Sequence, residues 1–166
     1  MAGLTDDQTE AFQVVDLYDR EIEVRTRAEC HADRTLIHRS VFVCISTPAG
    51  TVFQRRGLGK DSNPGWWCLA CAGHVAAGES YELAARRELA EEAGIEDPDL
   101  ALEHAGTFLL ELPDESEMAC VFRARYDGPL VVRPPEVIGL AAFPPGELPE
   151  PLTPSARRVL EFLRAG

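Results

Sequence analysis

Short runs of mostly apolar residues, separated by turn-forming residues, recur along the chain in the way that is typical of β-strands. β-branched and aromatic residues are frequent in these segments, as suits a pleated surface that is buried on at least one face. The segments with this pattern are Ala11–Asp19, Ile22–Thr26, Arg39–Thr47, Thr51–Arg55, Trp66–Ala72, Gly106–Leu112, Met118–Tyr126 and Val137–Phe143. The first two predict an N-terminal hairpin over about residues 11–26, and the next two a hairpin around Pro48-Ala49-Gly50.

Two segments have a helical pattern instead. Ser80–Ala93 places leucine and alanine on one face and charged residues on the other, with Gly94 as a stop signal. Pro154–Arg164 begins with the proline that favours a first helical turn. Many strands with one helix between them and another at the end predict an α/β fold, with a mixed central sheet and helices on its faces.

Composition narrows this picture to one globular domain. The chain has 166 residues, 45% hydrophobic and 27% charged, which is enough to bury a single core without a second one. The net charge of −12 disfavours nucleic acid polymers and anionic membranes as partners, although a small phosphate compound that arrives with a divalent cation is still compatible.

The cysteines and the N-terminal residues indicate in which cellular compartment we expect the protein. Five cysteines are scattered through the chain, no apolar run approaches a membrane span, and the acidic start is unlike a signal peptide. We therefore expect reduced thiols and a cytoplasmic location. The pair Cys68-Leu-Ala-Cys71 has no second pair to complete a zinc ribbon, so we expect buried free thiols there.

Three glutamates of the first predicted helix fall on one face. Glu88, Glu91 and Glu92 stand at i, i+3 and i+4, so their carboxylates lie within roughly 5–6 Å of one another. Such a cluster repels itself unless it is widely solvated or neutralised by hard cations, and Mg²⁺ or Mn²⁺ suits carboxylate oxygens. The alternative is an ordinary solvated helix face, paired with Arg86 and Arg87.

The surroundings of the cluster favour the metal interpretation. Gly73, Glu79, Arg87 and Gly94 complete the pattern G-x5-E-x7-R-E-U-x-E-E-x-G-U over residues 73–95, with U apolar. At every defining position this stretch resembles the box of the Nudix hydrolase superfamily.

The resemblance implies a Nudix fold, an α/β/α sandwich, and metal-dependent hydrolysis of a diphosphate linkage in a small molecule, such as a nucleoside di- or triphosphate or a nucleotide derivative. It implies that the Gly73 carbonyl and Glu88, Glu91 and Glu92 hold Mg²⁺ or Mn²⁺, and that Arg87 orients a glutamate. Which of the three glutamates acts as the base stays open.

A longer region, about residues 18–122, is similar to type 1 isopentenyl-diphosphate isomerase, itself a Nudix-fold enzyme. The matching positions are those of its metal ligands: His31, His38, His74, Glu115 and Glu117. Three imidazoles and two carboxylates suit Zn²⁺ or Mn²⁺. The residues alone leave a plainer alternative open, in which these histidines only pack or face solvent.

Cationic residues extend this second resemblance. Arg56 and Lys60, followed by Pro64-Gly65 and Trp67, match the isomerase segment that grips the diphosphate. A planar guanidinium and an ammonium are suited to that work, whereas a polar surface turn is the alternative. Trp66, Trp67 and Phe108 could stack on a base, hold a prenyl chain or pack in the core.

The chain also departs from the isomerase. That enzyme has a cysteine directly before its Gly-His pair, where this chain has Ala72, and a one-residue shift would point the thiol of Cys71 to the opposite face of a strand. The isomerase lacks the box glutamates at positions 88 and 91, and this chain keeps both. We therefore rank a hydrolase first, an unusual isomerase second and a nucleotide sensor without turnover third. A homodimer would be a family expectation only.

Overall fold

The computed structural model describes residues 6–166 of the chain, and its sheet is organised around one long strand. This strand, β3 (Ile37–Thr47), pairs antiparallel with β1 (Ala11–Val15), β4 (Gly50–Arg56) and β6 (Cys71–His74). It runs parallel to β8 (Ser116–Arg125) along almost its whole length. The sheet is therefore mixed, as the sequence predicts.

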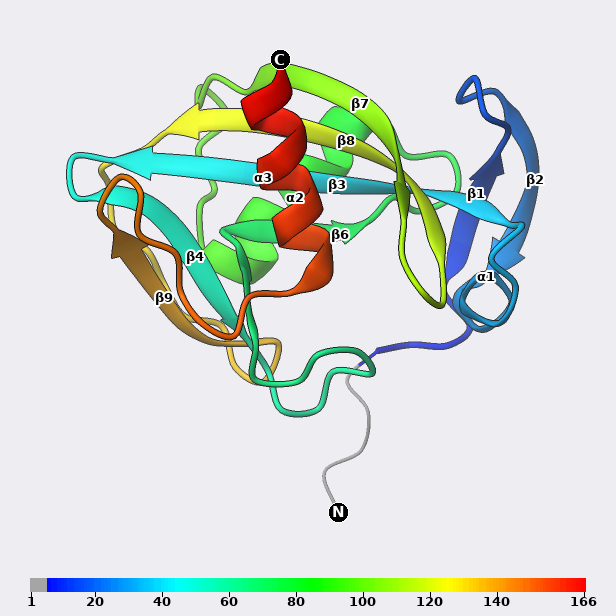
Figure 1. Ribbon diagram of the computed structural model, residues 1–166, viewed down its shortest axis with the longest axis horizontal. Coiled ribbons are helices and arrows are strands. Elements are labelled where there is room, and N and C mark those ends of the chain that lie inside the picture. The colour runs from blue at the N-terminus through cyan, green and yellow to red at the C-terminus, as the bar shows by residue number, and fades with distance from the viewer. Residues whose placement is uncertain (1–5) are drawn as a thin grey trace.

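The other strands extend the sheet on both sides of β3. β2 (Glu21–Thr26) pairs with β1, and β7 (Glu103–Glu111) pairs with β8. β5 (Trp67–Leu69) and β9 (Val137–Phe143) both pair with β4. Figure 1 shows β1 and β2 at one end of the molecule, and β4 and β9 toward the other.

Two helices cover opposite faces of the sheet. α3 (Pro154–Ala165) crosses in front of the strands in Figure 1 and α2 (Tyr81–Ala93) lies behind them. Successive β3 side chains serve the two cores in turn, because Val41 and Val43 belong to the cluster that includes α2 residues, and Phe42 to the cluster that includes α3 residues. Burial on both faces explains the nearly continuous apolar run of β3, and the predicted sandwich is confirmed.

Both predicted helices are confirmed, and their ends have local causes. The Ser80 hydroxyl accepts a hydrogen bond from the Leu83 amide at the start of α2, and Gly94 ends that helix with φ of 67°. At α3, the Thr153 hydroxyl caps the Ala156 amide and Pro154 occupies the first turn. No helix among residues 6–166 has the length and apolar character needed to cross a membrane.

Two predicted strands differ from the structure. The prediction of one strand over Trp66–Ala72 was wrong, because the chain changes partner at Ala70: β5 pairs with β4 and β6 pairs with β3. The strand predicted to run to Asp19 ends at Val15, because the Asp16 carboxylate accepts hydrogen bonds from the Tyr18 and Arg20 amides and closes a turn.

A short helix, α1 (Arg27–Ala32), was not predicted. Its start is a capping box: the Thr26 hydroxyl accepts from the Glu29 amide, and the Glu29 carboxylate accepts from the Thr26 amide. The Thr-x-x-Glu signal was present in the sequence. It was masked by the strand that precedes it without a break.

Candidate active site

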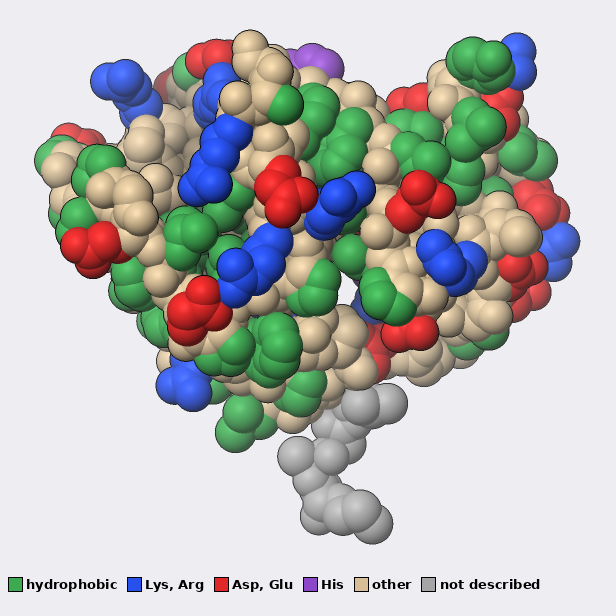
Figure 2. All heavy atoms as spheres, in the orientation of Figure 1, with side chains coloured by type: hydrophobic (Ala, Val, Ile, Leu, Met, Phe, Trp, Pro, Cys, Tyr) green, Lys and Arg blue, Asp and Glu red, His purple; other side chains and the backbone are tan. Residues whose placement is uncertain are grey.

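One cavity of about 790 Å³ gathers most of the residues singled out by the sequence. Its walls come from α1, α2, the start of α3 and the loop before β8. Figure 2 shows a hollow on the α3 face, between that helix and the β7–β8 turn. Both acidic and basic side chains line the cavity, which makes it suited to a charged ligand.

The three box glutamates reach this cavity from one helix, as their spacing predicts. Glu88 and Glu92 are buried, with exposed fractions of 7% and 5%, whereas Glu91 is exposed. Gly73 is needed for this arrangement because a Cβ at that position would overlap the Glu88 carboxylate. The backbone of β6 at Gly73 therefore lies directly against Glu88.

Arg87 connects the loop to the glutamates. Its guanidinium binds both carboxylate oxygens of Glu79, at 2.9 and 3.0 Å, and donates to the His74 carbonyl oxygen at 3.0 Å. The same group donates to Glu88 at 2.6 Å and to Glu91 at 3.3 Å. Glu88 is thus held by a charge-assisted hydrogen bond in the orientation that faces the cavity.

Glu92 is held from the sheet. The Gln54 amide donates to Glu92 Oε2 at 2.5 Å, and the Ala72 backbone N–H donates to the same oxygen at 2.9 Å. Gln54 is 1% exposed, so its amide is committed to this contact. With both donors on one oxygen, Oε1 of Glu92 has no protein donor among the described residues.

The buried glutamates are difficult to ionise. Burial raises the pKa of Glu92 to about 7, although the Ala72 N–H and Gln54 act against the rise. Burial and then the nearby charge of Glu92 raise the pKa of Glu88 well above its ordinary value, against the effect of Arg87. A bound cation would relieve both effects, because it favours the charged form of each carboxyl group.

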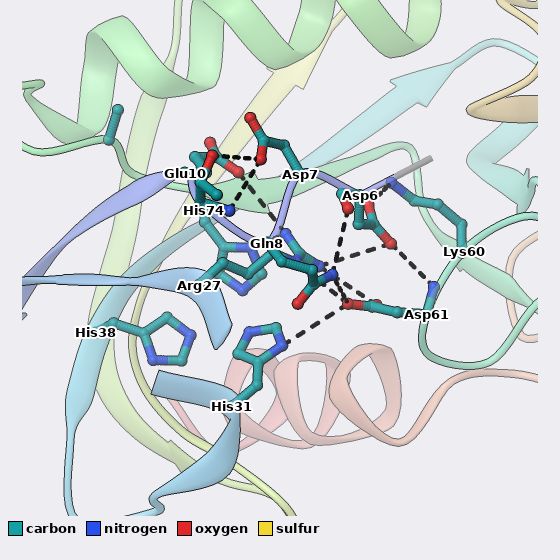
Figure 3. Close-up of polar contacts among 12 residues, drawn as sticks. Asp6, Asp7, Gln8, Glu10, Arg27, His31, His38, Lys60, Asp61 and His74 are labelled. Carbon is teal, nitrogen blue, oxygen red and sulfur yellow. Dashed lines mark hydrogen bonds and ion pairs between the residues drawn. The ribbon is translucent and has the colours of Figure 1, made fainter. Parts of the chain in front are cut away.

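The three histidines matched to the isomerase converge on one point. Their ring centroids lie 5.3 Å apart for His31 and His38, 5.2 Å for His31 and His74, and 4.9 Å for His38 and His74. Figure 3 shows the rings facing a common centre. Strand register explains part of this, because His38 is on β3 and His74 lies opposite Ser40 of the same strand.

The two carboxylates complete the group. Glu115 Oε2 lies 2.9 Å from His31 Nε2 and 3.5 Å from His38 Nε2, and Glu117 Oε1 lies 3.4 Å from His74 Nε2. Glu117 is paired with His38 across the parallel β3–β8 ladder, and its other oxygen accepts from the Ser40 hydroxyl at 2.6 Å. One ligand atom from each of His31, His38, His74 and Glu115 lies within 4.8 Å of the others.

Several buried atoms of this group are unsatisfied. His31 Nε2, His38 Nε2 and Glu115 Oε2 make no hydrogen bond to a described residue, because even the 2.9 Å contact between His31 Nε2 and Glu115 Oε2 lacks hydrogen-bond geometry. Buried polar atoms without partners are uncommon and costly, and a metal ion at their centre would satisfy all three. The donor set therefore fits Zn²⁺ or Mn²⁺.

The charges in this group are complementary. Burial lowers the pKa of His74 to about 4, and Arg27 donates to its Nδ1 at 3.2 Å, so the ring is neutral. Burial opposes ionisation of Glu115, but the adjacent His31 and His38 rings hold its pKa well below the ordinary value. For His31, the cost of burial is outweighed by Glu115, which raises the pKa of His31.

The predicted phosphate-binding cations differ in their surroundings. Lys60 and Arg56 both line the cavity. The Lys60 ammonium binds Asp6 at 2.7 Å and Glu136 at 2.5 Å, whereas Arg56 donates to the Ser62 carbonyl oxygen at 2.9 Å. Trp67 is not among the cavity-lining residues described; its ring packs edge-on against Phe143.

Two residues of the site were missed by the sequence interpretation. Gln54 precedes the double arginine on β4 and gives no signal of its own in one sequence. Arg27 opens α1 one turn before His31, and its guanidinium is nearly buried in the cavity wall, bonded to Asp61 at 3.2 Å. The capping box of α1 was the signal that could have placed Arg27 and His31 on one helix face.

The cysteines lie as predicted. Cys68 and Cys71 are buried free thiols, and Cys71 belongs to the core cluster that includes α2 residues. Ala72, one residue later on β6, faces the cavity. The thiol of Cys71 and the cavity are therefore on opposite faces of the strand.

Comparisons with known proteins agree with this geometry. The pattern that defines the NUDIX domain matches residues 36–163. An uncharacterised Nudix hydrolase of Pseudomonas aeruginosa is 40% identical over 138 residues, which cover 82% of this chain and 80% of that protein. An isopentenyl-diphosphate Delta-isomerase of Nocardia farcinica is 32% identical over 167 residues, covering 92% of this chain and 94% of the relative.

A solved structure supports the fold. The crystal structure of DR0079 from Deinococcus radiodurans superposes with a TM-score of 0.69 and covers 95% of this chain and 90% of that one, at 23% sequence identity. At that identity the likeness concerns the fold alone. The matched domain pattern, the relatives and the intact box together show that the chain belongs to the Nudix family.

Proposed function

We propose that this protein hydrolyses a diphosphate linkage in a small molecule, such as a nucleoside di- or triphosphate or a nucleotide derivative, with Mg²⁺ or Mn²⁺. The observation that carries the proposal is the arrangement of Glu88, Glu91 and Glu92 on one cavity wall, braced by Arg87 and Glu79. The buried carboxyl groups with raised pKa values fit a cation, as does the backbone of β6 at Gly73, which lies against Glu88.

The protein's own groups have separate tasks in this proposal. When bound, a divalent cation polarises a phosphorus–oxygen bond and lowers the pKa of water. Arg87 fixes Glu88, and Gln54 with the Ala72 N–H fixes Glu92, so that these carboxylates are already oriented for ligand binding. One of the three glutamates accepts the proton of the attacking water.

The diphosphate itself needs cationic partners. Arg56 and Lys60 line the same cavity as the box glutamates and are the proposed contacts for its oxygens. Trp67 supports the cavity wall from behind, because its backbone carbonyl accepts from the N–H of the cavity-lining Thr153 at 2.8 Å. A substrate that is neutralised in part by metal tolerates the acidic residues around it.

A second metal site is proposed at His31, His38, His74, Glu115 and Glu117, for Zn²⁺ or Mn²⁺. The convergence of the rings and the unsatisfied buried atoms support it. Arg87 donates to the His74 carbonyl oxygen, and His74 follows Gly73 on β6, so the two proposed metal sites adjoin at one strand.

An isomerase is the second candidate, favoured by the relative from Nocardia farcinica and by the convergence of His31, His38, His74 and Glu115, with Glu117 3.4 Å from the His74 ring. Against it stands Ala72, which presents a methyl group to the cavity where the isomerase has a thiol. A nucleotide sensor without turnover is the third candidate, and the intact box argues against it.

A release screen separates the three candidates. Purified protein is given a library of nucleotides, nucleotide sugars and other diphosphates with Mg²⁺ and with Mn²⁺, and orthophosphate and pyrophosphate are measured separately. We expect hydrolysis of at least one member and no dimethylallyl diphosphate from isopentenyl diphosphate. A clear isomer product would favour the isomerase, and tight nucleotide binding without any product would favour the sensor.

A substitution at Gln54, which is not itself a box residue, tests whether the box glutamates bind a metal ion. Replacing Gln54 with leucine leaves Glu92 Oε2 with only the Ala72 N–H, so the carboxyl group protonates more readily and Mn²⁺ affinity at the box should fall by about tenfold. Mn²⁺ titration followed by electron paramagnetic resonance measures this. An unfolding curve is the control, and an unchanged affinity would show that Gln54 serves packing only.

A further inference from the structure

The Asp6 carboxylate lies at the edge of the cavity, where it pairs with Lys60, one of the residues proposed to bind the diphosphate. Its side chain is only 4% exposed. One oxygen lies 2.7 Å from the Lys60 ammonium, and the other accepts from the Asp61 backbone N–H at 2.9 Å and lies 3.7 Å from the Arg27 guanidinium. Figure 3 shows Asp6 between Lys60 and Arg27.

These contacts are the kind that a phosphate group would make. An ammonium, a guanidinium and a backbone N–H are typical donors to phosphate oxygens, and both Asp6 oxygens are used. The neighbouring Lys60 and Asp61 N–H hold the pKa of Asp6 well below its ordinary value despite burial, so the group is an anion. Asp6 therefore imitates one oxoanion of a substrate.

The attachment of the segment allows Asp6 to leave. Gln8 and Glu10 are tied to the start of α1 through backbone bonds, from Ala28 N–H to the Gln8 carbonyl at 3.1 Å and from Arg27 N–H to the Glu10 carbonyl at 2.8 Å. Asp6 precedes these anchors, and its carboxylate is held by the three donors described above. Release of the Asp6 carboxylate would therefore leave these anchors and the pairing of β1 in place.

We propose that Asp6 is an internal competitor: its carboxylate occupies an anion position beside Lys60 and Arg27, and an anionic group of the substrate must displace it to bind. This inference rests on the proposed function, because the competing group is a phosphate of the diphosphate substrate. A phosphate brings more oxygens and more charge to the same donors than a carboxylate does, so the exchange is favourable once the substrate is present.

The test uses inorganic pyrophosphate without metal, with binding measured by calorimetry. Asp6→Asn keeps the size of the side chain and removes its charge, so pyrophosphate should bind about tenfold more tightly than to the wild type, as expected for the loss of one charged competitor. In steady-state assays of a hydrolysed library member, KM should fall and kcat should stay within about twofold. Asp6→Ala should act in the same direction.

Asp7→Asn is the matched control. It removes the same charge from the neighbouring residue, whose Oδ1 bonds only to Thr9 among the described residues. We expect no tightening in Asp7→Asn. In a Lys60→Gln background Asp6→Asn should tighten pyrophosphate binding much less than in the wild type, because the nearest of the three contested donors is then gone. Equal or weaker binding by Asp6→Asn, or equal tightening in either comparison, would overturn the proposal.

Failure of the proposed function would look different. In that case no library member is hydrolysed by the wild type or by Asp6→Asn, while pyrophosphate binding still reports whether Asp6 competes. If hydrolysis is found but Asp6→Asn binds pyrophosphate no better, the competition alone is wrong.

Discussion

Replacing Glu92 with glutamine should lower turnover by at least about 10²-fold while the fold stays intact. The glutamine can still accept hydrogen bonds from Gln54 and the Ala72 N–H through its carbonyl oxygen, so the packing around it is kept. The negative charge that a divalent cation needs is lost, however. Steady-state kinetics with saturating Mg²⁺ and a library member that is hydrolysed by the wild type measure the effect.

The same helix offers a matched control. Glu82 lies on the exposed side of α2, where it pairs with Arg86 at 3.0 Å, and Glu82→Gln should leave turnover unchanged. Substitutions on a solvated face usually change stability by no more than about 0.5 kcal/mol. Unchanged turnover in Glu92→Gln, or an equal loss in both variants, would remove the box glutamates from the proposed mechanism.

Replacing His31 with glutamine should weaken Co²⁺ or Zn²⁺ binding at the histidine site by more than about 10²-fold. His31 is the most accessible of the three rings, at the end of the short helix α1, so its loss should disturb the core least. Loss of a direct ligand exceeds the roughly 10–100-fold effect of losing a residue that supports one. The visible absorption of bound Co²⁺ and metal analysis of purified protein measure the change.

His104 provides the control for this experiment. It is exposed on β7 and bonded to Thr107 at 3.0 Å, so His104→Gln should bind metal like the wild type. Equal loss in both variants, or a wild type that binds no Co²⁺, would contradict the site.

Metal binding at the histidines should also depend on pH in a definite direction. The pKa of His31 is raised above its ordinary value because Glu115 outweighs the cost of burial. Imidazole must be neutral to bind a metal, so protons compete at His31 at a higher pH than at an ordinary histidine, and metal affinity falls as pH is lowered through the raised pKa. In His31→Gln the decrease of metal affinity on lowering the pH should be smaller than in the wild type, because this titrating ligand is absent.

The sequence by itself determined the elements with strong local signals. The box helix was predictable because its apolar face, its cap at Ser80 and its stop at Gly94 are all read within one segment. The long run of β3 was predictable because both of its faces are buried. The three glutamates on one wall followed from helical spacing alone, since i, i+3 and i+4 share a face wherever the helix packs.

Only the tertiary structure decided what depends on strand partners. The break at Ala70, where the chain changes from β4 to β3, leaves no mark in local propensity. Gln54 was invisible as a partner of Glu92, because a hydrogen bond across 38 positions has no periodicity in sequence. The approach of His31 to Glu115 likewise depends on where α1 and the β7–β8 loop pack. The sequence indicated that Lys60 contributes a positive charge to the site. Its contact with Asp6, 54 residues away, depends instead on how the N-terminal segment packs on α1.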